Sequence, residues 1–305
     1  MSYLDFTVFH VGGKGGIGDG TKVLKLCKNK PNNAELYIFE ADLSDEGDLA
    51  KNDKYIQKMK QKNGFDTKIL QYCVSDHNGV ENFYINRDRA SSSMFKMAPE
   101  METYNWPPMT NPMWKDHCSV DETREVKVST FDFIYENDLS IIPDVLSMDA
   151  QGSELDIMNG ASKIFEGDPL SVITEVEFRE IYDKQPLFSD QDSFLRDKGF
   201  IFANFFHVQE WFPGPPIGNP FFTVGEVVFL KDYRYLANKY ENDVDTLIPL
   251  IFKLAAISNA LGFSSYAYRV LDHIAHCNSE AYKSFVHDSV DEIVIRTSNF
   301  YKDNK

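Results

Sequence analysis

Three carboxylates have the residue type and spacing that acid–base chemistry requires. Asp149 follows a short apolar run at residues 145–148, and Glu175 and Glu177 lie two residues apart in the next apolar run. Side chains two apart on a strand point to the same face, and open α/β sheets present ligands at the carboxyl ends of their strands. We therefore expect Asp149, Glu175 and Glu177 to meet in one catalytic pocket.

Two roles for these carboxylates remain open. A general base would need a pKa raised by burial or by crowding with like charge. A divalent-metal site would instead acidify an acceptor hydroxyl. We favour the general base, because no additional pattern of Asn or Asp residues fixes a metal. Glu154 and Glu177 also have a structural interpretation, as acceptors from backbone amides or partners of Arg179, and for Glu154 we prefer it.

A glycine-rich turn at residues 11–21 predicts a cofactor site. Gly12 and Gly13 let the backbone approach a cofactor closely, although no Gly-Lys-Ser/Thr follows at the spacing of a Walker loop. Glu40 ends the next apolar run about 20 residues later, where a carboxylate grips the ribose hydroxyls in Rossmann-type sites. The alternatives are a mobile glycine loop and a solvated acid at a strand end.

Two segments without a clear period, residues 87–125 and 207–220, could shape a substrate pocket. We assign His117, His207 and Trp211, which lie within them, to the substrate. A histidine can serve as a base or bind a polar group, but a lone loop histidine is often simply solvated. A surface excursion without a role is the alternative for both segments.

The elements that must position these residues alternate in type. Apolar runs predict strands and periodic stretches predict helices, which together favour a mostly parallel α/β sheet with helices on both faces. The run at residues 68–74 is expected to form a hairpin with residues 82–85, and residues 222–229 an edge or inserted strand. The other predicted strands are residues 6–11, 36–39, 145–148 and 172–176, and the predicted helices are residues 21–27, 51–62 and 153–165.

After residue 232 the composition becomes helical. Two apolar stripes flank Gly262, and residues 255–271 look like one helix-turn-helix unit of the tetratricopeptide type. One unit cannot bury both of its faces alone, so it should dock on the sheet domain or on a second copy of the chain. We expect an α/β domain at residues 1–232 and a helical extension at residues 233–305, through which homo-oligomers could form.

An ordered series of motifs carries a family resemblance. Asp149 is followed by Gly152 and Glu154 at a helix start, then by Glu-Val-Glu-Phe at residues 175–178 and Gly-Phe at residues 199–200. Segments at residues 74–79, 91–93 and 126–132 fit upstream elements of the same series. Over residues 6–231 the chain resembles the FkbM family of S-adenosylmethionine-dependent methyltransferases. The resemblance implies a Rossmann-like class I methyltransferase fold and S-adenosyl-L-methionine as the cofactor.

The resemblance also implies which residues contact the cofactor. Gly12 and Gly13 would border it, Glu40 would hold the ribose, and residues 75–76 would lie near the adenine. His10 stands where the family usually has an acid that organises the methionine end of the cofactor. The complete cofactor set that we assign is Gly12, Gly13, Lys14, Glu40, Ala41, Ser75, Asp76 and Asp149.

Composition narrows the partners. A formal net charge of −16, with acidic side chains concentrated between residues 132 and 198, disfavours nucleic acid, an anionic membrane or an anionic polymer as partner. We expect no secretory signal, because residues 1–6 combine no basic and apolar regions, and no membrane span, because no apolar run reaches the roughly 20 residues required. The four cysteines form no C-x-x-C pair, so we expect a soluble cytoplasmic protein.

The expected function is O-methylation of a hydroxyl on a sugar, glycan or similar polar small molecule. A second hypothesis is a catalytically silent methyltransferase-like protein that binds partners through its helical tail, and His10 motivates it. A third is a nicotinamide-dependent oxidoreductase. The third lacks a regular G-x-G-x-x-G and does not explain the series between Asp149 and Phe178.

Overall fold

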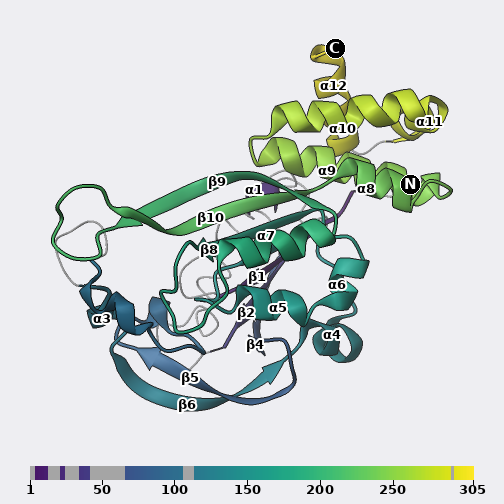
Figure 1. Cartoon of the computed structure of the whole chain (residues 1–305). Coiled ribbons are helices and arrows are strands. Elements are labelled where there is room, and N and C mark those ends of the chain that lie inside the picture. The colour runs from purple at the N-terminus through teal and green to yellow at the C-terminus, as the bar shows by residue number, and fades with distance from the viewer. Residues whose placement is uncertain (1–3, 13–20, 25–33, 42–65, 106–112, 290–291) are drawn as a thin grey trace.

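The computed structural model describes residues 4–12, 21–24, 34–41, 66–105, 113–289 and 292–305 (Figure 1). The predicted helix at residues 51–62 lies outside these ranges. Within the described part of the chain, no helix combines the length and the apolar character that crossing a bilayer would require.

A seven-stranded sheet forms the centre of the molecule, in the order β3-β2-β1-β7-β8-β10-β9. The first five strands in that order are parallel to one another, and β10 joins antiparallel to both β8 and β9. The fold class is therefore confirmed as a mostly parallel, Rossmann-like sheet, and β10 is the inserted strand. The strands are β1 (Phe6–Val11), β2 (Ala34–Glu40), β3 (Asp66–Gln71), β7 (Val145–Met148), β8 (Ser171–Glu177), β9 (Phe200–Trp211) and β10 (Phe221–Lys231).

Helices cover both faces of this sheet, as predicted (Figure 1). One face packs Phe9, Leu146, Val172 and their neighbours against four helices, and the opposite face packs Val8, Val145 and Ile173 against α1 (Thr21–Leu24) and the C-terminal helices. Because both faces are buried, the central strands read as continuous apolar runs, which is why they were recognisable in the sequence. The four helices of the first face are α4 (Phe131–Ile134), α5 (Glu154–Asn159), α6 (Ser162–Glu166) and α7 (Phe188–Asp197).

A second, three-stranded sheet corrects the predicted hairpin. Its order is β4-β6-β5, with β6 between the other two strands. The run at residues 68–74 divides at Tyr72: its first part belongs to β3 in the main sheet, and its last two residues form β4, which pairs parallel with β6. The hairpin prediction was therefore wrong, because the long-range strand β6 separates β4 from β5. The strands are β4 (Cys73–Val74), β5 (Gly79–Asn86) and β6 (Val120–Ser129).

Three further expectations need correction. The predicted helix at residues 153–165 is two helices, α5 and α6, separated at Gly160, where a Cβ would overlap the carbonyl oxygen of Ser75. The segment at residues 87–125 is not wholly irregular, since β6 begins inside it. Likewise β9 continues through residues 207–211. The short helical segments between β5 and β7 are η4 (Arg89–Ser91), η5 (Pro99–Thr103), α3 (Trp114–His117) and η6 (Tyr135–Leu139).

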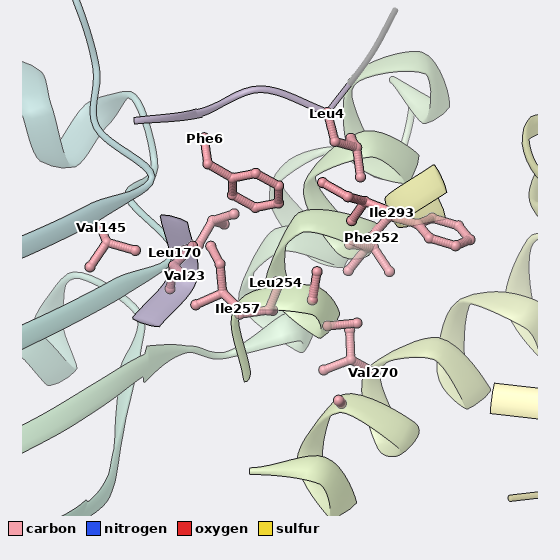
Figure 2. Close-up of a cluster of buried hydrophobic side chains, with 14 of the residues drawn as sticks. Leu4, Phe6, Val23, Val145, Leu170, Phe252, Leu254, Ile257, Val270 and Ile293 are labelled. Atoms are coloured by element: carbon pink, nitrogen blue, oxygen red, sulfur yellow. The ribbon is translucent and has the colours of Figure 1, made fainter. Parts of the chain in front are cut away.

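The C-terminal helices share one hydrophobic core with the sheet. Figure 2 shows Leu4 and Phe6 from the start of the chain, Val145 from β7 and Phe252 and Ile257 from α9 directed towards one another. Gly262 separates α9 from α10 with a φ of 94°. The domain boundary at residue 232, the tetratricopeptide likeness and homo-oligomerisation stay predictions. The helices are α8 (Tyr233–Lys239), α9 (Val244–Ala260), α10 (Ser264–Cys277), α11 (Ser279–Asp288) and α12 (Glu292–Asp303).

A buried ion pair joins these helices to the sheet. Lys231 is fully buried at the end of β10, and its Nζ lies 3.2 Å from Oδ1 of Asp168. Oδ2 of Asp168 also accepts hydrogen bonds from Lys239 Nζ at 2.6 Å and Tyr240 Oη at 2.8 Å, both from the α8 region. Burial lowers the pKa of Lys231 to about 8, while Asp168 opposes that shift. The carboxylate of Asp168 is thus the anion that makes a buried ammonium group tolerable.

We predict that Asp168→Asn destabilises the protein by about 3–5 kcal/mol, because it leaves the Lys231 ammonium buried without its anion. Asp168 has a φ of 59°, a conformation that Asn also tolerates, so the change removes charge with little backbone strain. Thermal and urea unfolding measure the loss. The matched control is Asp192→Asn, which breaks a solvent-accessible pair with Arg196, whose own side chain is exposed, and should cost less than about 1 kcal/mol. Equal losses in the two variants would contradict the assignment.

Candidate functional site

A cavity lies at the carboxyl ends of β1, β2 and β7. This is the position where the strand order reverses, with β2 and β3 on one side of β1 and β7 on the other. Open α/β sheets bind their ligands at such a position. The lining residues are Val11, Gly12, Phe39, Glu40, Ala41, Tyr72, Cys73, Val74, Phe83, Arg89, Ala90, Ser92, Met94, Asp149, Ala150, Gln151, Ser153 and Ile157.

Gly12 is required where the chain leaves β1. Its φ is 92°, and a Cβ at this position would overlap the backbone carbonyl of Asp149. The Gly12 amide donates to the Phe39 carbonyl at 3.0 Å, and the Asp149 amide donates to the Val11 carbonyl at 2.9 Å. The three strand ends that border the cavity are thereby held together through their backbones. Gly13 and Lys14, also assigned to the cofactor, lie outside the described residues.

Glu40 and Ala41 line the cavity at the end of β2, as the assignment to a cofactor ribose requires. Glu40 is buried, and its charge contributes, after burial, to raising the pKa of the Cys73 thiol to about 12. Cys73 is therefore an unreactive wall residue. The cavity wall thus includes a buried carboxylate at the end of β2.

Ser75 and Asp76 lie beside the cavity and are not part of its lining. Ser75 is buried, and its Oγ donates to Asp76 Oδ1 at 3.3 Å. Asp76 is exposed and lies 2.7 Å from His77 Nδ1. Their neighbours Cys73 and Val74 supply the wall instead. A role for Ser75 and Asp76 at the adenine stays a prediction.

The three predicted catalytic carboxylates lie near one another, and one of them, Asp149, lines the cavity. The Nε2 atom of Gln151 lies 2.6 Å from Asp149 Oδ1 and 3.0 Å from Glu175 Oε2. Glu177 lies farther along β8 and is fully buried. Burial, followed by the charges of Asp149 and Glu177, raises the pKa of Glu175 well above its usual value.

Glu177 has an environment that disfavours its charge. Burial, followed by the charge of Glu154, raises its pKa well above the usual range. Among the described residues, neither carboxylate oxygen of Glu177 has a hydrogen-bond partner. Arg179, the partner considered from the sequence, instead donates to Tyr104 Oη at 2.8 Å. The alternative of an ion pair between Glu177 and Arg179 is therefore wrong.

Glu154 has the structural role preferred from the sequence. Its carboxylate accepts from the Ala150 amide at 2.7 Å and from the Gly152 amide at 3.0 Å. These bonds close the turn between Asp149 and α5. Burial raises the pKa of Glu154 to about 7, although the two amides oppose the shift.

His10 holds the backbone at the start of the glycine turn. It is buried, with Nε2 2.8 Å from the Gly12 carbonyl and Nδ1 3.0 Å from Ser147 Oγ. A ring with its proton on Nε2 donates to the carbonyl and can accept from the hydroxyl. The residue at the usual acidic position thus positions the turn through two hydrogen bonds.

The three residues assigned to the substrate are dispersed. Trp211 is buried against Trp114 with ring centroids 5.0 Å apart, and belongs to a local core. His117 Nδ1 lies 2.8 Å from Asp88 Oδ2, next to the lining residue Arg89, but His117 itself does not line the cavity. His207 is exposed on the edge strand β9, opposite Glu226. The structure brings none of the three to the cavity wall.

The sequence reasoning missed Gln151 and Tyr182. Gln151 bridges Asp149 and Glu175, and its Oε1 accepts from Tyr182 Oη at 2.8 Å. It also missed the wall formed by Arg89, Ala90, Ser92 and Met94, although these residues begin the segment that lacked a period. For Gln151, the available signal was its position between Asp149 and Gly152 in the most specific motif.

Comparison with known proteins identifies a family. The methyltransferase FkbM domain family matches residues 18–202, more than half of the 305-residue chain. Among solved structures, a methyltransferase FkbM from Methylobacillus flagellatus KT is similar at 10% sequence identity with a TM-score of 0.39. That similarity covers 73% of this chain and 43% of the other, so the chain spans less than half the length of that protein. No curated protein matches the sequence.

The raised pKa of Glu177 predicts a pH-dependent stability. A carboxyl whose pKa is higher in the folded state adds stability below its unfolded pKa, and this contribution is lost as the pH rises through the folded pKa. Glu177→Gln replaces the carboxyl with an amide that cannot ionise. We therefore expect the variant's melting temperature to exceed that of the wild type most at about pH 8, and to decrease less than that of the wild type between about pH 5 and about pH 8. Each kcal/mol recovered corresponds to roughly 2–4 °C.

Differential scanning calorimetry across this pH range measures the effect. Glu180→Gln, at an exposed position nearby, is the control and should leave the slope unchanged. If Glu177→Gln shows the same slope as the wild type, Glu177 does not carry the burial cost that we assign to it.

Proposed function

The chain belongs to the FkbM methyltransferase family, and from this premise we propose that it transfers a methyl group from S-adenosylmethionine to a hydroxyl oxygen of a sugar, glycan or similar polar small molecule. The observation that supports this most is the cavity at the strand-order reversal, where Gly12, Glu40 and Asp149 converge. The same cavity and the family together argue for a cofactor site at this place.

The residues present fit S-adenosylmethionine. The absent Cβ of Gly12 allows the strand ends to approach one another, and Glu40 offers a buried carboxylate at the end of β2. A carboxylate at this position can accept hydrogen bonds from two neighbouring ribose hydroxyls. When bound, the cofactor supplies a strongly electrophilic methyl group on its sulfonium sulfur.

The chain's own contribution is to orient the acceptor and to accept its proton. Asp149 lines the cavity, and Glu175 is joined to it by the Gln151 amide. The raised pKa of Glu175 makes its ionised form a stronger base than an ordinary glutamate, which favours removal of a hydroxyl proton. We propose Asp149 as the group that meets the acceptor and Glu175 as its neighbour. A catalytic role for Glu177, which lies behind them, stays a prediction.

The acceptor class follows from charge. The charge of Asp149 disfavours the ionisation of Glu154, Glu175 and Glu177, and the charge of Glu154 disfavours that of Glu175 and Glu177. An anionic acceptor would be repelled by this group, whereas a neutral polyol can donate hydroxyl hydrogen bonds to it. In the described residues, no group of three or more His, Cys, Asp or Glu side chains is arranged to hold a metal ion.

The cofactor proposal is tested by isothermal titration calorimetry with S-adenosylmethionine. We expect Glu40→Gln to weaken binding by roughly 10- to 100-fold, because it removes a charged acceptor of hydrogen bonds. Glu35→Gln is the control on the same strand, since Glu35 bonds to Tyr37 and does not line the cavity. No binding by the wild type would remove the enzyme proposal and favour a methyltransferase-like interaction module.

The acceptor proposal is tested with methyl-labelled S-adenosylmethionine and a library of neutral sugars, glycans and anionic counterparts. We expect transfer to a neutral member, with a decrease of roughly 10²- to 10⁴-fold in Asp149→Asn, the range that general-base catalysis supplies. Asp192→Asn, at a partly exposed position on α7 outside the cavity lining, should retain the wild-type rate. Transfer confined to anionic or amine acceptors would contradict the proposed substrate class.

A further inference from the structure

The amide of Gln151 lies between the two carboxylates nearest the cavity. Its Nε2 is 2.6 Å from Asp149 Oδ1 and 3.0 Å from Glu175 Oε2. A side-chain NH₂ group has two protons, so one amide can donate to both carboxylates at once. Asp149 follows β7 and Glu175 lies in β8, and when both acids are ionised their like charges repel each other. The amide therefore offsets a repulsion that would otherwise separate them.

Tyr182 fixes the orientation of that amide. Its Oη lies 2.8 Å from Gln151 Oε1 and 2.9 Å from the Ser91 carbonyl, so its one proton is shared between these two acceptors, and the ring is fully buried. With Oε1 turned towards the tyrosine hydroxyl, Nε2 faces the carboxylates. The reverse orientation would aim Oε1 at both acids, which is favourable only if both carry protons.

The backbone of Gln151 is fixed as well as its side chain. Its φ of 54° is uncommon for a residue with a side chain. Ser93 Oγ donates to the Gln151 carbonyl at 2.6 Å, and the Phe95 amide donates to the same Ser93 oxygen at 2.9 Å. The segment that supplies Arg89 and Ser92 to the cavity wall is thereby joined to the turn that carries Asp149. Backbone conformations of this kind persist where the surroundings over-determine them, often at functional sites.

We propose that Gln151 is a positioning residue, which holds Asp149 and Glu175 together and facing the cavity while Tyr182 sets the orientation of its amide. This role rests on the proposed function, because it concerns the acids assigned there to the acceptor. Gln151 acts through them, and its side chain need not touch the reacting atoms.

The test observes the carboxyl groups without any ligand. Protein labelled with ¹³C at the glutamate δ-carboxyl is titrated by NMR, and the Glu175 signal is assigned from its absence in Glu175→Gln. The acids that face Glu175 are Asp149, Glu154 and Glu177, and Glu226 lies opposite it on β10, so all are kept unchanged in every other sample.

Gln151→Met preserves approximate volume but removes the donor, and should raise the titration midpoint of Glu175 by about one to two pH units, the range set by a hydrogen bond to a charged group. Tyr182→Phe keeps the amide but removes its lock, and should raise the midpoint by a smaller amount. Tyr266→Phe removes a hydroxyl that donates to the Lys231 carbonyl at 2.7 Å outside the site, and should not move it.

An unchanged or lowered midpoint in Gln151→Met would overturn the positioning role, because a side chain that only fills space is replaced by Met without a change in titration. If Gln151→Met does not fold, Tyr182→Phe decides: an unchanged midpoint there overturns the proposal. The measurement needs no S-adenosylmethionine, so its failure is distinct from a failure of the wild type to bind the cofactor.

Discussion

The contact between the backbone of Gly12 and the carbonyl of Asp149 is the constraint on which the site depends. It brings the end of β1 against the end of β7, where the strand order reverses: β2 and β3 lie on one side of β1, and β7 and β8 lie on the other. Every residue that we assign to chemistry is placed relative to this contact. Glu40 stands on one side of it at the end of β2, and the carboxylates of β7 and β8 stand on the other. His10 stabilises this contact through the hydrogen bond between its Nε2 and the Gly12 carbonyl.

The site also gathers carboxyl groups in an environment that disfavours their ionised forms. Glu154, Glu175 and Glu177 all have raised pKa values, and burial is the largest cause for each. Neutral groups donate hydrogen bonds to two of these carboxylates. Backbone amides donate to Glu154, and the Gln151 side-chain amide donates to Glu175. Neutral donors reduce the cost of ionisation without cancelling the charge, so the carboxylates keep their capacity to take a proton.

Much of the fold was predictable, and the errors have a common physical cause. The strands at residues 6–11, 145–148 and 172–176 are buried on both faces and mostly apolar, so local pattern alone identified them. The hairpin prediction failed because β6, which begins at Val120, pairs between β4 and β5. Long-range contacts also explain Trp211 and Gln151. Trp211, which we assigned to the substrate, is buried against Trp114, and the role of Gln151, which we overlooked, depends on its contact with Tyr182. Glu40 and Asp149, whose positions follow from strand ends, line the cavity, and their assigned roles stay predictions.

The shared core of the C-terminal helices and the sheet bears on how this protein can be divided in the laboratory or in evolution. Phe252 and Ile257 of α9 pack in the same hydrophobic cluster as Val145 of β7 (Figure 2). Ile251 of α9 and Val8 of β1 belong to this cluster too. A chain cut after β10 would expose this apolar face directly behind the strands that end at the cavity. Gene fusions and domain exchanges should therefore carry the helices along with the sheet, whatever separate task the helices also perform.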